Sequence, residues 1–181
     1  MSRRVEVISQ VPVLEAKLFT VNETRVKYTN GIEQTYHDIH RKSAVSVFPI
    51  THTYDVYLAS QYRYTLQKKT LEAVAGIIED GEQPLEAAKR ELKEELGLTA
   101  ETWDSLAAVE QSASIIRATQ HLFLARDIKR GKAFPEDSEE IAIVKLPLQE
   151  AIEKVMSGQI NTGMTSIGLF MIDRLRQQKK I

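Results

Sequence analysis

AGIIEDGEQPLEAAKRELKEELGL, from Ala75 to Leu98, is the stretch that decides the fold. It predicts the end of a strand, a turn at residues 79–81 and a helix from Pro84, because proline fits a first helical turn, where its missing N–H would be unpaired anyway. Gly97 predicts the end of the helix, since glycine readily turns left-handed after the last helical turn. Four apolar residues at helical spacing predict one buried stripe: Leu85, Ala88, Leu92 and Leu96.

Three glutamates lie beside this stripe. Glu91 precedes Glu94 by three residues and Glu95 by four, and side chains at those offsets are neighbours on one helix face. Like charges at this spacing repel, so the cluster gains nothing for the helix itself. Carboxylate oxygens are the ligands that Mg²⁺ and Mn²⁺ use, especially where a substrate brings phosphate. The alternative from these residues alone is an ordinary solvated acidic face, eased by the basic residues among them.

The spacing of the defined residues resembles the Nudix box, which is a glycine, five residues, a glutamate, seven residues and then Arg-Glu-aliphatic-x-Glu-Glu-x-Gly-aliphatic. Here Gly76 is followed after five residues by Glu82, and after seven more by RELKEELGL from Arg90. Every defined position matches over 23 residues. The resemblance implies hydrolysis of a nucleoside diphosphate linked to another group, with a divalent metal. It also implies an α/β fold, the αβα sandwich with a curled mixed sheet.

The resemblance further implies roles for single residues. Glu91 and Glu95 are expected as direct metal ligands, and Glu94 as a direct or water-mediated ligand that takes part in catalysis. The Ala75 backbone carbonyl is expected as a further ligand, and Mg²⁺ as the cofactor, with Mn²⁺ also possible. The remaining motif positions are expected to be structural, with Glu82 paired to Arg90 to hold the loop; they are Gly76, Glu82, Arg90 and Gly97.

A second likeness lies outside the box. Gln61-Tyr62-Arg63, together with Glu72 shortly before Ala75-Gly76, is similar to the ADP-ribose and nucleoside diphosphate sugar pyrophosphatase branch of the family. In that branch the arginine and the glutamate contact the substrate. Arg63 is therefore a candidate diphosphate contact, because a guanidinium fork matches phosphate oxygens, and Glu72 is a candidate for a ribose hydroxyl. The alternatives are a surface salt bridge, for example to Asp55, and an outward-facing glutamate.

The general base is expected in the charged loop KRGKAFPEDSEE, residues 129–140. Hydrolysis of a phosphoanhydride needs a water activated by a metal, a carboxylate or both. The resemblance implies a glutamate ahead of the last strand, predicted at residues 141–146. The candidates are Glu140, then Glu139, then Glu136, because residues next to the strand are better anchored. A merely flexible charged loop is the alternative.

Residues 1–40 predict a separate β subdomain ahead of a hydrolase domain at 41–181. Strands are predicted at 5–8, 14–21 and 24–28, with turns at Asn22-Glu23 and at Asn30-Gly31. So few strands seldom bury enough apolar surface alone, so we expect support from the main domain or from a second subunit in a homodimer. Phe19, Tyr28 and Tyr62 are candidates for a nucleobase slot.

In the rest of the chain, adjacent strands are predicted at 43–50 and 56–60, and further strands at 71–76 and 121–125. One helix is predicted after residues 147–150, ending at Met156, and a last helix from Ile167 to Gln177.

The composition narrows the function. The chain has 181 residues and a formal net charge of −1, and this charge argues against a nucleic-acid-binding surface. It has no cysteine, which excludes a thiolate nucleophile and a disulfide framework. No run has the length of a membrane span, so a cytoplasmic protein is expected. That it is an enzyme acting on a nucleotide sugar is what the resemblance implies. Another Nudix activity and a non-catalytic nucleotide-binding module are the alternatives; the complete carboxylate set favours an enzyme. Which base and sugar are preferred stays open.

Overall fold

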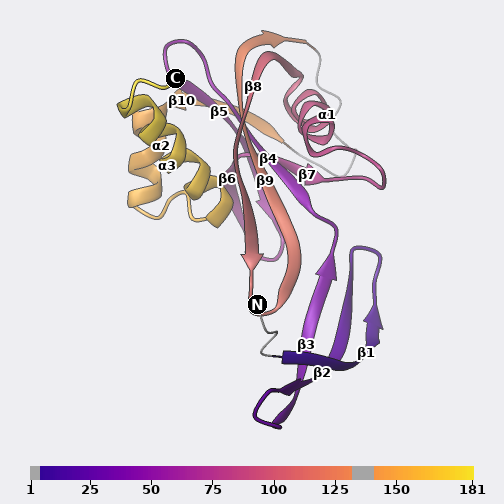
Figure 1. Ribbon diagram of the computed structural model, residues 1–181. Coiled ribbons are helices and arrows are strands. Elements are labelled where there is room, and N and C mark those ends of the chain that lie inside the picture. The colour runs from indigo at the N-terminus through magenta and orange to yellow at the C-terminus, as the bar shows by residue number, and fades with distance from the viewer. Residues whose placement is uncertain (1–4, 132–140) are drawn as a thin grey trace. The chain divides into compact units, whose positions relative to one another are not determined.

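Three antiparallel strands form the N-terminal part of the computed structural model, which describes residues 5–131 and 141–181 (Figure 1). They are β1 (Val5–Glu15), β2 (Phe19–Tyr28) and β3 (Glu33–Arg41), with β2 hydrogen-bonded on both sides. The first residues of β9 (Ile116–Arg130) pair in parallel with β3, Ile116 opposite Ile39. β1, β2, β3 and the first residues of β9 belong to one compact unit, Met1–Ser43 with Glu110–Thr119.

Of the two turns predicted within the N-terminal strands, one is confirmed. At Asn30-Gly31 the Tyr28 N–H donates to the Ile32 carbonyl at 2.8 Å, and Gly31 has φ +85°, a conformation that favours glycine. The turn predicted at Asn22-Glu23 is wrong, because both residues lie inside β2. Asn and Glu are poor strand formers by propensity, but the ladders to β1 and β3 override that preference.

The second unit, Ala44–Val109 with Gln120–Ile181, contains two sheets. In the mixed sheet β4 (Ala44–Pro49) pairs in parallel with β9 and antiparallel with β7 (Val74–Ile77), and β8 (Leu98–Ser112) pairs with β9. The other sheet has the order β10 (Ala142–Pro147), β5 (Asp55–Arg63), β6 (Lys68–Glu72). The strands predicted as adjacent at 43–50 and 56–60 therefore form β4 and β5 in different sheets, and an isolated bridge joins Ile50 to Val56.

Helices cover both faces of these strands, as Figure 1 shows: α1 (Pro84–Leu96) on one side, α2 (Leu148–Met156) and α3 (Gly163–Gln177) on the other. Alternating side chains of the strands enter two cores. Val47 packs with Leu92 of α1, whereas the next residue, Phe48, packs with Leu169 of α3. This is the expected αβα sandwich. In the described part of the chain, no helix has both the length and the apolar character needed to cross a membrane.

The predicted helix of the motif is confirmed at both ends. Pro84 is its first residue, and Gly97 adopts the left-handed conformation with φ 62° while its N–H donates to the Lys93 carbonyl at 3.0 Å. The last helix starts at Gly163 rather than at Ile167, one turn earlier than predicted. The Ser166 N–H closes that added turn by donating to the Thr162 carbonyl at 3.1 Å.

Candidate active site

The acidic side of α1 lies directly against β7. The Glu91 carboxyl group occupies the space beside Gly76 so closely that a Cβ built on Gly76 would overlap it. Only glycine leaves room for such an approach between a side chain and a strand backbone. Gly76 therefore determines where the Glu91 carboxylate lies.

Arg90 ties the helix to the loop that precedes it. Its Nε and Nη2 donate to the two carboxylate oxygens of Glu82 at 3.0 Å each, and Nη2 also donates to the Ile77 carbonyl at 2.9 Å. Glu82 in turn accepts the Glu79 N–H at 3.0 Å. The structure thus contains the Glu82–Arg90 pair that the motif implies, and the pair closes the loop between β7 and α1.

The same guanidinium also contacts two glutamates of the cluster on α1. Nη1 of Arg90 donates to Glu91 at 2.6 Å and to Glu94 at 3.1 Å. The hydrogen bonds to Glu82, and then those to Glu91 and Glu94, raise the pKa of Arg90, while the bonds from Arg90 lower the pKa of Glu82. Arg90 and Glu82 are therefore both ionised at neutral pH, and the guanidinium lies among the carboxyl groups of Glu82, Glu91 and Glu94.

The donor atoms on this face fit a hard divalent cation. They comprise the carboxylates of Glu91, Glu94 and Glu95, with the Ala75 carbonyl on β7, and such all-oxygen sets suit Mg²⁺ and Mn²⁺. Glu95 is only 6% exposed, and burying a carboxylate is costly unless it is paired or coordinates a metal. Among residues 5–131 and 141–181, no three acidic, His or Cys side chains converge on one point. Glu91 and Glu94 turn toward Arg90 instead, so their assignment as ligands stays a prediction.

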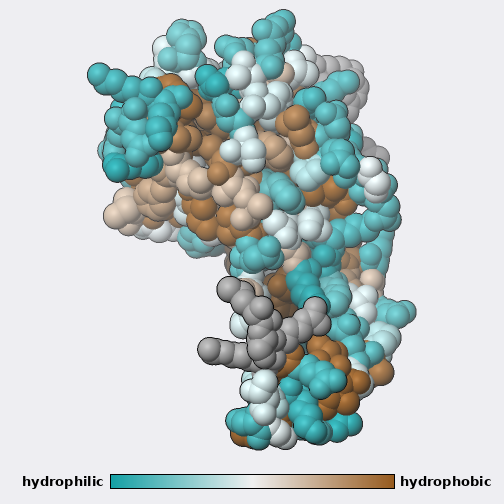
Figure 2. Space-filling view, in the orientation of Figure 1, coloured by the Kyte–Doolittle hydropathy of each residue, from teal (hydrophilic) through white to brown (hydrophobic). Residues whose placement is uncertain are grey.

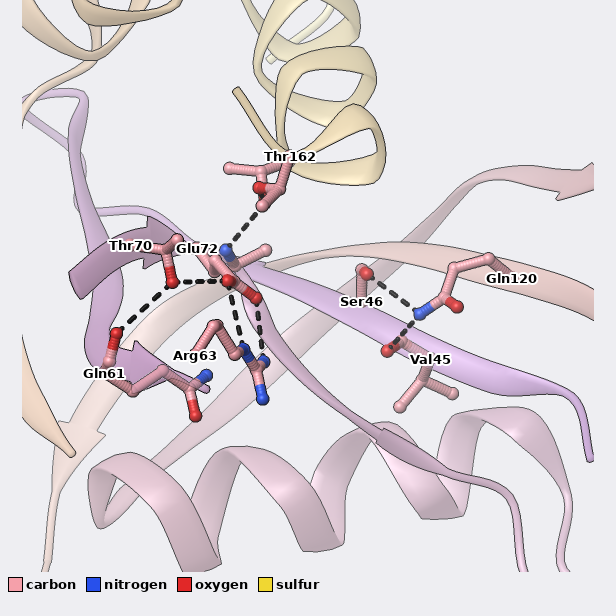
Figure 3. Close-up of polar contacts among 10 residues, drawn as sticks. Val45, Ser46, Gln61, Arg63, Thr70, Glu72, Gln120 and Thr162 are labelled. Carbon is pink, nitrogen blue, oxygen red and sulfur yellow. Dashed lines mark hydrogen bonds and ion pairs between the residues drawn. The ribbon is translucent and has the colours of Figure 1, made fainter. Parts of the chain in front are cut away.

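A second polar cluster lies on the β5–β6 hairpin (Figure 3). Arg63 donates two hydrogen bonds to the Glu72 carboxylate, from Nε to Oε1 at 3.1 Å and from Nη2 to Oε2 at 2.8 Å. Glu72 is paired in register with Ala59, which packs in the same core as α1. Because residues two apart on a strand share a face, Arg63 and Glu72 point to the side of the sheet that α1 covers.

Arg63 and Glu72 are therefore brought together in a salt bridge, in which the Arg63 side chain is 38% exposed and the Glu72 side chain 11%. Asp55 pairs with Lys145 at 2.8 Å rather than with Arg63, and Glu72 is 9% exposed rather than outward-facing. Burial raises the pKa of Glu72, but hydrogen bonds from Arg63 and Thr70 outweigh it and hold the pKa below its usual value. Glu72 is thus an anion at neutral pH, and its pair with Arg63 persists until the pH falls through that lowered pKa.

Hydrogen bonds that sequence reasoning missed anchor the strands around this cluster (Figure 3). The Ala73 N–H, between Glu72 and Val74, donates to the Thr165 hydroxyl at 3.1 Å, and Thr162 donates to the same oxygen at 2.9 Å. α3 thereby fixes the junction of β6 and β7. These threonines lie about ninety residues from Ala73, so no local pattern could have revealed the contact.

A buried amide supports the strand next to β7. Gln120 of β9 donates from Nε2 to the Val45 carbonyl at 2.6 Å and to the Ser46 hydroxyl at 3.0 Å (Figure 3). Ser46 lies opposite Ala75 in the β4–β7 register. Gln120 therefore steadies the strand that pairs with the expected carbonyl ligand, and the sequence analysis had not singled it out.

The other predicted residues lie elsewhere or outside the described residues. Tyr62 on β5 is 56% exposed. Phe19 and Tyr28 are at the two ends of β2, in the other unit, where the Tyr28 and Tyr36 hydroxyls share a hydrogen bond of 2.5 Å. The three candidate bases, Glu136, Glu139 and Glu140, fall in the segment 132–140 that the structure does not describe.

Comparison with known proteins identifies the family. The NUDIX domain model matches residues 40–162. The methanol dehydrogenase activator of Bacillus methanolicus is 30% identical over 146 residues, 80% of this chain and 79% of that protein. The ADP-ribose pyrophosphatase of Bacillus subtilis (strain 168) is 25% identical over 164 residues, 90% of this chain and 89% of that protein.

Two further relatives carry the name ADP compounds hydrolase. NudE of Escherichia coli (strain K12) is 25% identical over 162 residues, 88% of this chain and 87% of that protein. A crystal structure of an ADP compounds hydrolase has the same fold, with a TM-score of 0.88, 24% identity and coverage of 99% and 98% of the two chains. With its complete motif and its matching fold, the chain belongs to the Nudix hydrolase family, whose members use divalent metal ions.

Proposed function

We propose that the protein hydrolyses the diphosphate linkage of ADP-sugars, with ADP-ribose as the first candidate, to AMP and a sugar phosphate. The observation that carries the proposal is the bidentate Arg63–Glu72 pair on the face of the sheet that α1 covers. A cation for phosphate and an anion for sugar hydroxyls are what a nucleotide sugar requires beyond a Nudix metal site. The names of the relatives from Bacillus subtilis and Escherichia coli favour adenosine as the nucleoside.

Glu91, Glu94, Glu95 and the Ala75 carbonyl would hold the divalent cation, which we propose to be Mg²⁺. When bound, such an ion neutralises diphosphate charge and lowers the pKa of a bound water. Arg90 donates hydrogen bonds to Glu91 and Glu94 and, through Glu82, keeps the loop in place. Gly76 sets the distance between Glu91 and the strand backbone.

Arg63 and Glu72 would orient the substrate. The guanidinium binds phosphate oxygens, and the Glu72 carboxylate keeps that guanidinium in one orientation while accepting a hydrogen bond from a sugar hydroxyl. For the base that deprotonates the attacking water, we retain a loop glutamate, Glu140 before Glu139 and Glu136, on the strength of the resemblance alone.

The N-terminal strands are proposed to support a homodimer and to contribute Phe19 or Tyr28 to the nucleobase slot, alongside Tyr62. The support is the apolar surface that β1 exposes, including Val7, Val11 and Val13. Figure 2 shows hydrophobic surface on the unit that contains the N-terminal strands. Analytical ultracentrifugation is expected to find twice the chain mass of 20.5 kDa, and a chain lacking residues 1–35 is expected to lose substrate affinity. A truncated chain that is monomeric and fully active would sink this proposal.

The substrate proposal is tested by incubating the protein and Mg²⁺ with a panel of nucleotide substrates. Hydrolysis is measured as the formation of phosphomonoester products, from which a phosphatase releases inorganic phosphate. The panel should include ADP-ribose, ADP-glucose, GDP-mannose, UDP-glucose, a nucleoside triphosphate and a dinucleoside polyphosphate. We expect the ADP-sugars to be cleaved fastest. Cleavage of the last two alone would mean another Nudix activity, and no cleavage of any substrate would favour a nucleotide-binding module.

A further inference from the structure

The buried hydroxyl of Thr70 donates a hydrogen bond to the carboxylate of Glu72. Thr70 lies on β6, two residues before Glu72, and is only 5% exposed. Its hydroxyl is 2.5 Å from Glu72 Oε1 and 3.3 Å from the Gln61 carbonyl oxygen (Figure 3). A threonine hydroxyl has one proton to donate, and the shorter contact to a charged acceptor takes it.

The hydroxyl completes a fixed arrangement around Glu72. Oε1 accepts from Thr70 and from Arg63 Nε, while Oε2 accepts from Arg63 Nη2. With donors on two sides, the carboxylate plane has little freedom to rotate. The Arg63 fork is coplanar with that carboxylate in a bidentate pair, so the orientation of the guanidinium follows that of Glu72.

We propose that Thr70 is a positioning residue: its buried hydroxyl orients Glu72, and through Glu72 it orients Arg63 for the diphosphate sugar. The proposal rests on the function proposed above and adds a residue that the Nudix motif does not include. Without the hydroxyl, Glu72 keeps Arg63 but loses the contact that sets the plane of the pair. Substrate binding should weaken, whereas the metal-dependent step on α1 should be largely unaffected.

The matched set of variants is Thr70→Val, Thr70→Ser and Thr65→Val. Valine keeps the shape of threonine and removes the hydroxyl, and serine keeps the hydroxyl. Thr65 is exposed at the tip of the same hairpin, so its replacement controls for the substitution itself. The readouts are KM and kcat for ADP-ribose, together with the thermal unfolding midpoint.

We expect Thr70→Val to raise KM about tenfold, the usual cost of one lost hydrogen bond to a charged group, with kcat changed much less. Thr70→Ser and Thr65→Val should keep a KM close to that of the wild type. An unchanged KM in Thr70→Val, or a serine variant as impaired as the valine variant, would overturn the proposal. Should the valine variant not fold, Thr70→Ala removes the same hydroxyl without adding bulk.

Failure of the proposed function would be distinguishable from failure of this inference. If the wild type does not cleave ADP-ribose, the role of the hydroxyl is read instead from the carbon-13 NMR titration of the Glu72 carboxyl group. Loss of a donor to the ionised form raises a carboxyl pKa. A higher pKa of Glu72 in Thr70→Val than in Thr70→Ser is expected, and identical titrations would contradict the positioning role.

Discussion

Glu95→Gln is expected to lower kcat on ADP-sugars by on the order of a hundredfold or more, as for a lost ligand to a catalytic metal. Glu95 is buried on the α1 side that carries the motif glutamates, and glutamine keeps its size while removing its charge. A neutral amide is a weaker ligand for a hard cation. The loss should be measured at saturating substrate over a range of Mg²⁺ concentrations.

Glu86→Gln is the matched control for this variant. Glu86 lies on the same helix, but it is exposed, and its carboxylate accepts a hydrogen bond from Lys89 at 2.9 Å. Surface ion pairs of this kind contribute little to the free energy of folding. Activity should therefore remain near that of the wild type. Equal losses in the two variants, or full activity in Glu95→Gln, would rule out Glu95 as a ligand.

Gly76→Ala should reduce activity while leaving the fold intact. The new methyl group would meet the carboxyl end of Glu91, and a flexible side-chain end can move away where a backbone could not. The displaced carboxylate no longer lies where Gly76 sets it, and disturbing the surroundings of a metal ligand typically costs roughly 10–100-fold in activity or metal affinity. Activity and thermal unfolding should therefore be measured on the same preparation.

Gly163→Ala provides the comparison, because a Cβ at Gly163 meets no atom within 4 Å. It begins α3, where alanine is at least as well tolerated as glycine. We expect its activity and unfolding midpoint to match or exceed those of the wild type. Full activity in Gly76→Ala would show that the position of Glu91 against β7 does not matter.

The parts of the fold that sequence predicts well are those with local causes. Pro84 and Gly97 bound α1 because their backbone preferences act within a turn of where they lie. Asn30-Gly31 forms its turn for the same reason. The Glu82–Arg90 pair follows from a fixed spacing across one loop and helix.

The parts that sequence missed depend on distant partners. Asn22 continues a strand because neighbours on both sides hold it there, and β4 and β5 separate into two sheets because each finds other partners. Thr70 is the exception: its position two residues before Glu72 places both on one face of a strand. That local signal was available, but it gains meaning only once Glu72 is known to be buried.

The most direct measurement of the central claim is the product analysis of ADP-ribose incubated with the wild-type protein and Mg²⁺, with and without excess chelator. Liquid chromatography should show AMP and ribose 5-phosphate in equal amounts, and no products once the metal is chelated. That result is what a diphosphate hydrolase with an α1 metal site must give. Intact ADP-ribose in the presence of Mg²⁺, or cleavage that persists with the chelator, would contradict the account.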